Sequence, residues 1–179
     1  MEILKNKLEN KLNIRTQKNY PIEGIEFIDI IPLFMKSEIL NEIIEKMVDE
    51  IIKYDVDYIL VPEARGFLIG SAIAKELGIG IVVARKKGKI PTDFVESCFE
   101  YEKEYGKDYL ELPKLDNQDY INKKFYIVDD IYATGNTMKS IKKEVEKLGG
   151  KILGSGVIIN IPDLNKEKNI FSLIDIKET

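Results

Sequence analysis

Two adjacent carboxylates, Asp129 and Asp130, precede a turn rich in small and hydroxyl residues, in the string VDDIYATGNTMKS. An apolar strand is predicted to run into the pair, and the segment 133–137 then leads into a predicted helix. Free backbone N–H groups at the start of a helix bind anions, and the hydroxyls of Thr134 and Thr137 add donors. We therefore predict a phosphate site beside the acidic pair.

The acidic pair would repel a phosphate unless it faced another part of the same ligand. Hydroxyl groups or a bound Mg²⁺ are suitable partners for the carboxylates of Asp129 and Asp130. A sugar phosphate satisfies both sites, because its phosphate can lie in the turn while its 2′- and 3′-hydroxyls face the carboxylates. Ribose 5-phosphate is such a ligand. The alternative is that the Asp pair only caps and solubilises a loop.

Other catalytic motifs are missing from the sequence. Neither the nucleotide P-loop GxxxxGK[ST] nor the dinucleotide fingerprint GxGxxG occurs. The chain has no His and a single Cys, Cys98, which argues against a zinc site of the usual type and against Ser-His or Cys-His nucleophiles. We expect any metal to be bound by oxygen, and any catalysis to use carboxylates, Tyr, Lys or Arg.

The composition is typical of one soluble globular domain. The chain has 179 residues, of which 44% are hydrophobic and 32% charged, with a net charge of −4. Acidic and basic residues are interspersed, so we expect no nucleic-acid partner. No apolar run approaches the roughly 18 residues that span a bilayer, and the N-terminus does not resemble a secretory signal. We expect no membrane contact and a cytoplasmic location.

Strand and helix patterns alternate along the chain. Apolar residues recur at helical spacing in 38–53, and Ser37 is the candidate N-cap. Further helices are predicted at 66–78 and 137–150, and strands at 57–62, 80–85, 124–130, 151–160 and 170–176. This order predicts one α/β domain over residues 1–179, with a mostly parallel twisted sheet flanked by helices on both faces. Ligands bind at the carboxyl ends of such strands.

Residues 86–113 form a polar insertion between the two βαβ units. The second half of this insertion, 97–112, alternates around a Gly-containing turn, which favours a hairpin. A segment of this length between core elements is more often a functional lid than an idle loop.

The string VDDIYATGNT resembles the phosphoribosyl-pyrophosphate (PRPP) signature of the type I phosphoribosyltransferases. Three further strings, VPEARGFLIGSAIAKELGIGIVVARKKGKIP, EYGKDYLEL and YPIEGIEFIDIIPLF, resemble the adenine phosphoribosyltransferase family in its order and at nearly its spacing. The resemblance extends from Tyr20 to about Leu164. It implies the type I fold with a flexible lid hairpin and a small base-binding hood. The implied function is purine salvage, in which the 5-phosphoribosyl group of PRPP is transferred to adenine, giving AMP and pyrophosphate.

The resemblance also implies which residues bind PRPP. They are Arg65, Arg85, Lys86, Lys89, Asp129, Asp130, Ala133, Thr134, Gly135, Asn136 and Thr137. The forked guanidinium of Arg65 suits phosphate oxygens, and Glu63 in the same turn is expected only to shape it. The acidic pair would contact Mg²⁺ indirectly, through PRPP. In the family the basic segment 85–89 reaches the pyrophosphate partly from a neighbouring subunit, so a homodimer is implied. Taken alone, that run of charge is typical of solvated surface.

The resemblance places further catalytic residues in the lid. Glu104 and Tyr105 match lid residues, and Glu104 is the candidate acid/base at the purine N7. With Arg65 they form the implied catalytic set. The alternative for Glu104 is a solvated side chain on a surface hairpin.

The implied adenine pocket consists of Glu26, Phe27, Ile28 and Ile161, with Phe27 stacking on the purine. Phe27 could equally be a core residue. Ile28 stands where the family commonly has Arg, and Asn136 replaces the second Gly of the signature, so the backbone approaches phosphate less freely although Asn tolerates the left-handed conformation.

The string GVIINIPDL indicates which purine the pocket would accept. Oxopurine enzymes of the superfamily place a Lys near the final strand, and this string has none, which favours adenine. The alternatives are a phosphoribosyltransferase for hypoxanthine or guanine, or a non-catalytic purine or PRPP sensor. Such sensors usually carry an added DNA-binding domain and a basic surface.

Overall fold

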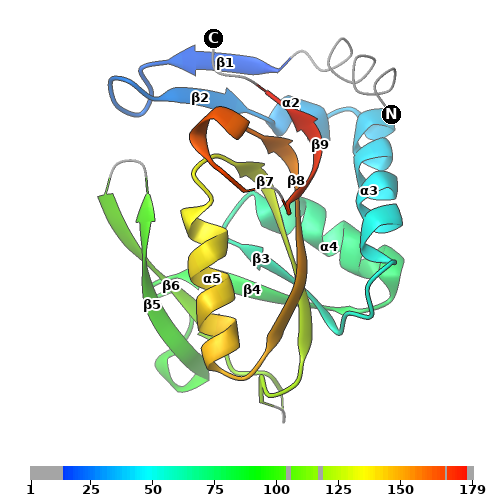
Figure 1. Cartoon of the computed structure of the whole chain (residues 1–179), viewed down its shortest axis with the longest axis vertical. Helices are drawn as coiled ribbons and strands as arrows, with labels where there is room; N and C mark the ends of the chain where they lie inside the picture. The colour runs from blue at the N-terminus through cyan, green and yellow to red at the C-terminus, as the bar shows by residue number, and fades with distance from the viewer. Residues whose placement is uncertain (1–13, 104–105, 117–118, 168, 177–179) are drawn as a thin grey trace.

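A seven-stranded sheet with the order β5-β6-β4-β3-β7-β8-β9 forms the centre of the protein (Figure 1). This computed structural model describes residues 14–103, 106–116, 119–167 and 169–176. The strands are β3 (Tyr58–Pro62), β4 (Gly80–Lys86), β5 (Val95–Lys103), β6 (Gly106–Pro113), β7 (Lys124–Tyr132), β8 (Lys151–Asn160) and β9 (Phe171–Asp175). β4, β3, β7, β8 and β9 pair in parallel, whereas β6 is antiparallel to both β4 and β5. The predicted mostly parallel α/β sheet is confirmed.

Helices cover both faces of the sheet, as predicted. The helices α3 (Ser37–Ile51) and α4 (Gly66–Leu77) share one core cluster with Tyr126 and Val128 of β7. The helix α5 (Asn136–Lys147) shares a second core cluster with Phe125 and Ile127 of the same strand. Because successive side chains of a strand point to opposite faces, a strand buried on both sides needs an almost continuous apolar run.

The ends of the helices differ in part from the predictions. α4 ends at Leu77, and its C-cap Gly78 has the left-handed conformation with φ 68°, as expected for a glycine at a helix end. The N-cap prediction for Ser37 is wrong, because the carbonyl of Lys36 already accepts hydrogen bonds from the amides of Ile39 and Leu40 and makes Lys36 the N-cap. α5 begins at Asn136, one residue before the predicted start at 137.

The strands β5 and β6 form the predicted hairpin, with pairs from Val95 opposite Pro113 to Lys103 opposite Gly106. β6 joins the edge of β4, so the hairpin extends the main sheet. At its base the Ser97 hydroxyl donates a hydrogen bond to the buried carboxylate of Glu144 on α5. The role of this hairpin as a lid stays a prediction.

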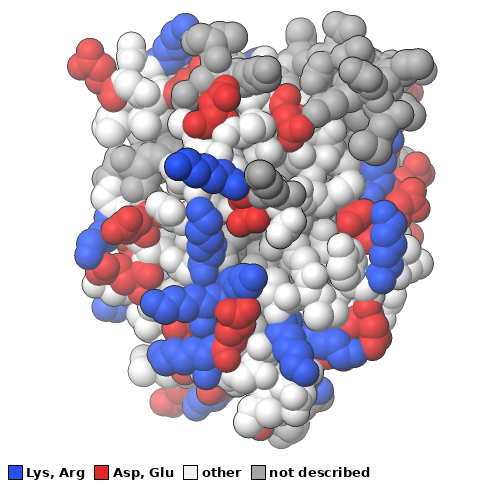
Figure 2. Space-filling model, viewed as in Figure 1, with Lys and Arg blue, Asp and Glu red and all other residues white. Residues whose placement is uncertain are grey.

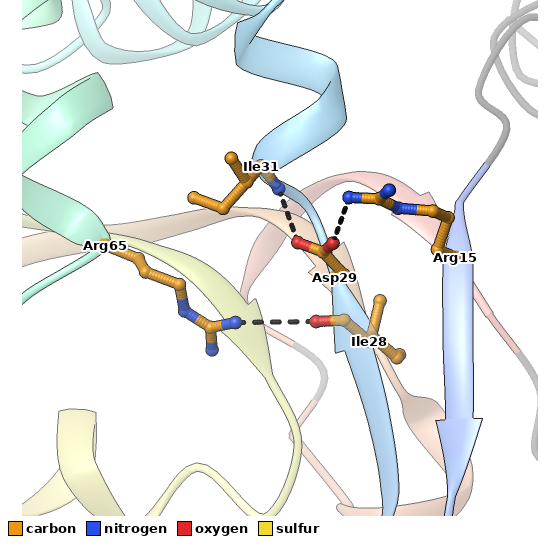
Figure 3. A network of polar contacts seen from close by, with 5 residues as sticks. All are labelled: Arg15, Ile28, Asp29, Ile31 and Arg65. Carbon is orange, nitrogen blue, oxygen red and sulfur yellow. Dashed lines mark hydrogen bonds and ion pairs between the residues drawn. The ribbon is translucent and has the colours of Figure 1, made fainter.

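A separate small sheet lies across the end of the molecule near the carboxyl ends of β7 and β8 (Figure 1). It consists of β1 (Arg15–Lys18) and β2 (Glu26–Asp29), which pair antiparallel, and the short helix α2 (Ile31–Phe34) follows it. An ion pair of 2.6 Å joins Arg15 to Asp29, and Asp29 also accepts the amide of Ile31 at 3.1 Å (Figure 3). We call β1, β2 and their connecting loop the hood.

Charged side chains of both signs are interspersed on the face that carries α5 and the hairpin (Figure 2). Within the described residues, none of the helices is long and apolar enough to cross a membrane.

Candidate active site

Two cavities adjoin at the carboxyl ends of the central strands. The first, of about 360 Å³, lies between the turns that follow β3 and β7. The second, of about 590 Å³, lies under the hood. Arg65, Ile131, Ala133 and Thr134 line both cavities, so a ligand that fills one can extend into the other.

The turn after β7 presents free amides, as expected for an anion site, although the amide of Asn136 donates to the hydroxyl oxygen of Thr134 at 3.5 Å. The Ala133 carbonyl accepts a hydrogen bond from Asn165 Nδ2 at 2.9 Å, and the Thr134 carbonyl accepts one from Lys139 Nζ at 3.1 Å. Within the described part of the chain, the amides of Ala133, Thr134 and Gly135 donate to no acceptor. Unpaired N–H groups ahead of a helix form a nest for phosphate oxygens.

The conformation of this turn depends on Gly135. Gly135 has φ 77°, and a Cβ added to it would lie 2.1 Å from Oη of the buried Tyr132. Asn136 is the first residue of α5, so it needs no left-handed backbone. Asn tolerates a left-handed backbone better than most residues do, but Asn136 does not adopt that conformation here.

The acidic pair lies within β7, because the strand continues to Tyr132 and does not end at the carboxylates. Both Asp129 and Asp130 line the first cavity. Asp130 is only 3% exposed, and its Oδ2 lies 2.7 Å from Arg65 Nε. The two side chains form an ion pair, but their geometry does not make a hydrogen bond. The sequence predicted that both acids face the ligand, whereas the structure pairs one of them with Arg65.

Asp129 lies in an environment that favours its neutral form. Burial raises the pKa of Asp129 well above its usual range, and the neighbouring charge of Asp130 raises it further. The amide of Asp130 donates a hydrogen bond to Asp129 Oδ1 at 2.9 Å, and the charge of Arg65 also favours the ionised form, but neither outweighs burial. A cation or a sugar hydroxyl at Asp129 would stabilise the ionised carboxylate.

The acidic pair fits Mg²⁺ only as part of a larger set of ligands. The described residues contain no group of three or more Cys, Asp or Glu side chains that could hold a metal. Carboxylate oxygens are the ligands that Mg²⁺ prefers, and Mg²⁺ commonly takes one or two of them together with water and substrate phosphates. Asp129 and Asp130 therefore suit an ion that arrives with a phosphate ligand.

Arg65 connects the two cavities. It is the N-cap residue of α4, directly after the turn that follows β3. Its Nη1 donates a long hydrogen bond of 3.4 Å to the carbonyl of Ile28 in the hood (Figure 3), and its guanidinium lies 5.7 Å from the ring centroid of Phe27. The same side chain therefore contacts the acidic pair and the hood.

All four predicted adenine residues, Glu26, Phe27, Ile28 and Ile161, line the second cavity. Phe27 is half-buried and meets the ring of Tyr20 edge-on at 5.2 Å, so it is not a fully buried core residue. The side chain of Ile28 is buried in the core, and its carbonyl faces Arg65. Sequence reasoning did not single out Tyr20, Ile131, Leu164 or Ile176, which also line this cavity. Tyr20 opens the quoted string YPIEGIEFID, which was the available signal.

Of the predicted basic residues Arg85, Lys86 and Lys89, only Lys86 lines the first cavity. Arg85 Nε instead donates to Glu63 Oε2 at 3.0 Å, and the same oxygen accepts the Lys86 amide at 2.9 Å. Burial acts to raise the pKa of Glu63, but these hydrogen bonds and the charge of Arg85 outweigh it and lower the pKa overall. Glu63 thus holds the basic segment, a role that the sequence did not predict.

Two predicted catalytic residues, Glu104 and Tyr105, lie outside the residues that the structure describes. Tyr101 and Glu102 on the same hairpin line the first cavity, and sequence reasoning did not select them. The alternating pattern of the sequence along β5 does not distinguish Tyr101 and Glu102 from their neighbours.

Residues 35–178 match the family described as phosphoribosyl transferase domain. The chain is 42% identical over 156 residues to an adenine phosphoribosyltransferase of Clostridium botulinum, covering 86% of this chain and 87% of the relative. The chain belongs to the adenine phosphoribosyltransferase family. The fold agrees, since the crystal structure of adenine phosphoribosyltransferase from Thermoanaerobacter pseudethanolicus matches with a TM-score of 0.84 and 36% identity, covering 94% of this chain and 98% of that one.

A second adenine phosphoribosyltransferase structure, from Saccharomyces cerevisiae, was solved in complex with adenine and an imino-altritol bisphosphate. It is 31% identical to this chain with a TM-score of 0.78, covering 97% of this chain and all of that one (100%). A bisphosphate and a purine are therefore bound together by a member of the family with this fold.

Proposed function

We propose that this protein is a purine-salvage enzyme that transfers the 5-phosphoribosyl group of PRPP to N9 of adenine, forming AMP and releasing pyrophosphate. The observation that carries this proposal is the junction of the two cavities at Arg65. One cavity combines free amides with two carboxylates, and the other is lined mostly by apolar residues, Phe27 among them. A sugar phosphate and a purine placed in them would meet beside Arg65.

The residues of the first cavity suit a reaction governed by charge. Breaking the C1′–O bond leaves positive charge on the sugar and negative charge on pyrophosphate, so fixed charges favour the transition state. We assign the 5-phosphate to the amides of Ala133–Gly135, the sugar diol to Asp129, and the pyrophosphate to Arg65 and Lys86. Mg²⁺ held by PRPP beside Asp129 and Asp130 would neutralise charge on the leaving group.

The hairpin supplies the remaining roles in this proposal. By family resemblance, Glu104 would handle the proton at the purine N7, and Tyr105, the next residue in the sequence, would belong to the same catalytic set. Closure of the hairpin over the first cavity would exclude water from a sugar cation that hydrolyses readily. Tyr101 and Glu102, which already line this cavity, show that the hairpin reaches it.

Adenine is the purine that the second cavity favours. Among the described residues that line it, Glu26 and Arg65 are the only charged ones, and there is no lysine to meet a 6-oxo group. The yeast relative of known structure holds adenine, which supports the same choice.

A competition assay tests this function. Purified protein, Mg²⁺ and PRPP are mixed with equal concentrations of adenine, hypoxanthine and guanine, and the nucleotide products are separated and quantified. We expect AMP to dominate. IMP or GMP as the main product would assign the enzyme to another purine, and PRPP binding without any nucleotide would favour a sensor.

We also propose that the enzyme works as a homodimer in the cytoplasm. Arg85 is paired with Glu63, and Lys89 does not line the cavity of its own chain, so we assign Lys89 to the site of a neighbouring subunit. Apolar Leu68 on α4 and Ile81 on β4 are 53% and 37% exposed, and they offer a surface for contact. The exposed free thiol of Cys98 suits a reducing compartment. Light scattering should give twice the chain mass of 20.6 kDa, and a mass of one chain would contradict the dimer.

A further inference from the structure

Glu111 on β6 is a buried carboxylate that none of the roles above uses. It is 6% exposed, and its neighbours across the sheet are Arg85 of β4 and Cys98 of β5. Its Oε1 accepts a hydrogen bond of 3.0 Å from the amide of Gly88. Its Oε2 is buried without a hydrogen-bond partner among the described residues. Burial of a half-satisfied carboxylate costs free energy, so the fold keeps this group at a cost.

Gly88 is the centre of the tight turn that follows β4. The amide of Lys89 donates to the carbonyl of Lys86 at 3.1 Å and closes the turn, while Gly88 has φ 80°, a conformation that favours glycine. The only side chain that the amide of Gly88 contacts in the described structure is Glu111. Two hydrogen bonds therefore join the turn to β6: the amide of Gly88 donates to this carboxylate, and the amide of Lys87 donates to the carbonyl of Tyr109 at 3.2 Å.

The turn carries a concentration of positive charge that opposes its folding. Residues 85–89 contain one arginine and three lysines around Gly88. Like charges this close repel one another, and two carboxylates lie against the segment. Glu63 holds the start of the segment through the amide of Lys86, and Glu111 holds its tip through the amide of Gly88.

We propose that Glu111 is a positioning residue that holds the turn 86–89 so that Lys86 faces the pyrophosphate cavity. This inference rests on the proposed function, because it assigns Glu111 an effect on PRPP and pyrophosphate alone. Glu111 does not line either cavity, so it acts through the turn and not by touching substrate. Its effect should fall on the binding of PRPP and spare the binding of adenine.

Three substitutions at Glu111 separate its possible contributions. Glu111→Ala removes the acceptor, and Glu111→Asp keeps the charge but withdraws the oxygen from Gly88. Both should raise KM for PRPP and the Kd of Mg²⁺-pyrophosphate by about tenfold, the effect expected when a hydrogen bond to a charged group is lost. Glu111→Gln keeps an oxygen that can accept the Gly88 amide, so it should restore both values to within about twofold of the wild-type protein. KM for adenine and kcat at saturating PRPP should stay within about twofold in all three.

The measurements are steady-state kinetics with each substrate varied, and calorimetric titration with Mg²⁺-pyrophosphate. Glu96→Ala on the same hairpin is the matched control, because Glu96 is exposed on β5, and its KM for PRPP should not change. Wild-type protein without transferase activity would refute the proposed function. Active wild-type protein with an unchanged KM for PRPP in Glu111→Asp would overturn the inference.

A purely structural role for Glu111 would give a different pattern. It would lower Tm and kcat and raise both KM values together, and this outcome would also overturn the inference. If Glu111→Ala does not fold, the opposite expectations for Glu111→Asp and Glu111→Gln still decide the question.

Discussion

Arg65 is the side chain through which the acidic pair, the hood and both cavities are in contact. Replacing it with alanine removes a forked donor for pyrophosphate oxygens, so we predict that kcat/KM for PRPP falls by about 100-fold or more. Arg65→Lys should recover little of the loss, because an ammonium cannot reproduce the planar fork. Steady-state kinetics with PRPP as the varied substrate measure both effects.

Stability measurements on the same variant distinguish binding from folding. Arg65→Ala leaves Asp130 buried without its ion pair, and we expect a loss of about 1–2 kcal/mol, less than for a fully buried pair because the Arg65 side chain is 37% exposed. Adding Asp130→Asn should recover part of this stability without recovering activity. Recovery of activity in the double variant would mean that Arg65 only neutralises Asp130.

Asp129 ties stability to function through its raised pKa. The folded protein holds the proton of Asp129 more tightly than the unfolded chain does, so stability falls as the pH rises above the ordinary pKa of Asp, 3.8. We predict that Asp129→Asn has a Tm close to that of the wild-type protein near pH 4. Its Tm should be higher at pH 7, by about 2–4 °C for each kcal/mol that is relieved. Thermal unfolding of both proteins across this pH range measures the difference.

The same substitution should abolish most PRPP-dependent turnover, because the amide cannot replace the carboxylate toward the sugar diol. A difference in Tm that stays constant with pH would contradict the raised pKa. Unimpaired turnover would remove Asp129 from the site.

The turn between β7 and α5 is the element that holds the proposed phosphate site. Gly135→Ala forces a left-handed residue to carry a Cβ and drives that Cβ into Tyr132. We predict a destabilisation of about 2–4 kcal/mol, the sum of backbone strain and steric overlap, and a loss of PRPP binding. Denaturant unfolding and calorimetric titration with PRPP measure the two effects.

Gly78→Ala is the matched control for this turn. Gly78 has a similar φ of 68° at the end of α4, but a Cβ there would meet nothing within 4 Å. Only the strain of about 1–2 kcal/mol should appear, with PRPP binding retained. Equal effects of the two substitutions would show that the contact with Tyr132 is unimportant.

At the scale of the whole molecule, the site lies where a single sheet meets the hood. The two core clusters share the strand β7, and the hairpin extends the same sheet, which supports our proposal that the chain is one domain. A ligand across both cavities would connect β3, β7 and the hood, so its binding should stabilise the whole fold.

We predict that Mg²⁺ and PRPP at 100 times the Kd of PRPP stabilise the protein by about 2.7 kcal/mol and raise Tm by about 5–10 °C. Differential scanning calorimetry measures the shift. Arg65→Ala at the same ligand concentration should show a clearly smaller shift. A similar shift in both proteins would indicate stabilisation away from the proposed site.

Sequence reasoning succeeded where the chemistry is local. The free amides of Ala133–Gly135, the hairpin and the helix stop near Gly78 follow from neighbours in the chain. The amide of Asn136, which was also predicted to be free, donates to Thr134 Oγ1. Sequence reasoning failed by one residue at Ser37, where several N-cap positions are compatible with the same helical pattern. The roles of Glu104 and Tyr105 stay predictions.

The sequence by itself determined the order of strands and helices in the central sheet, the turn proposed to bind phosphate, and the family, because apolar periodicity and turn chemistry are properties of neighbouring residues. It did not predict the strands β1 and β2 or the helix α2. Only the tertiary structure decided that Asp130 pairs with Arg65, that Arg85 turns to Glu63, and that Glu111 reaches Gly88. These contacts join residues more than 20 positions apart. Local spacing determines which face of an element a side chain occupies, but the packing of the sheet determines which distant side chain it meets.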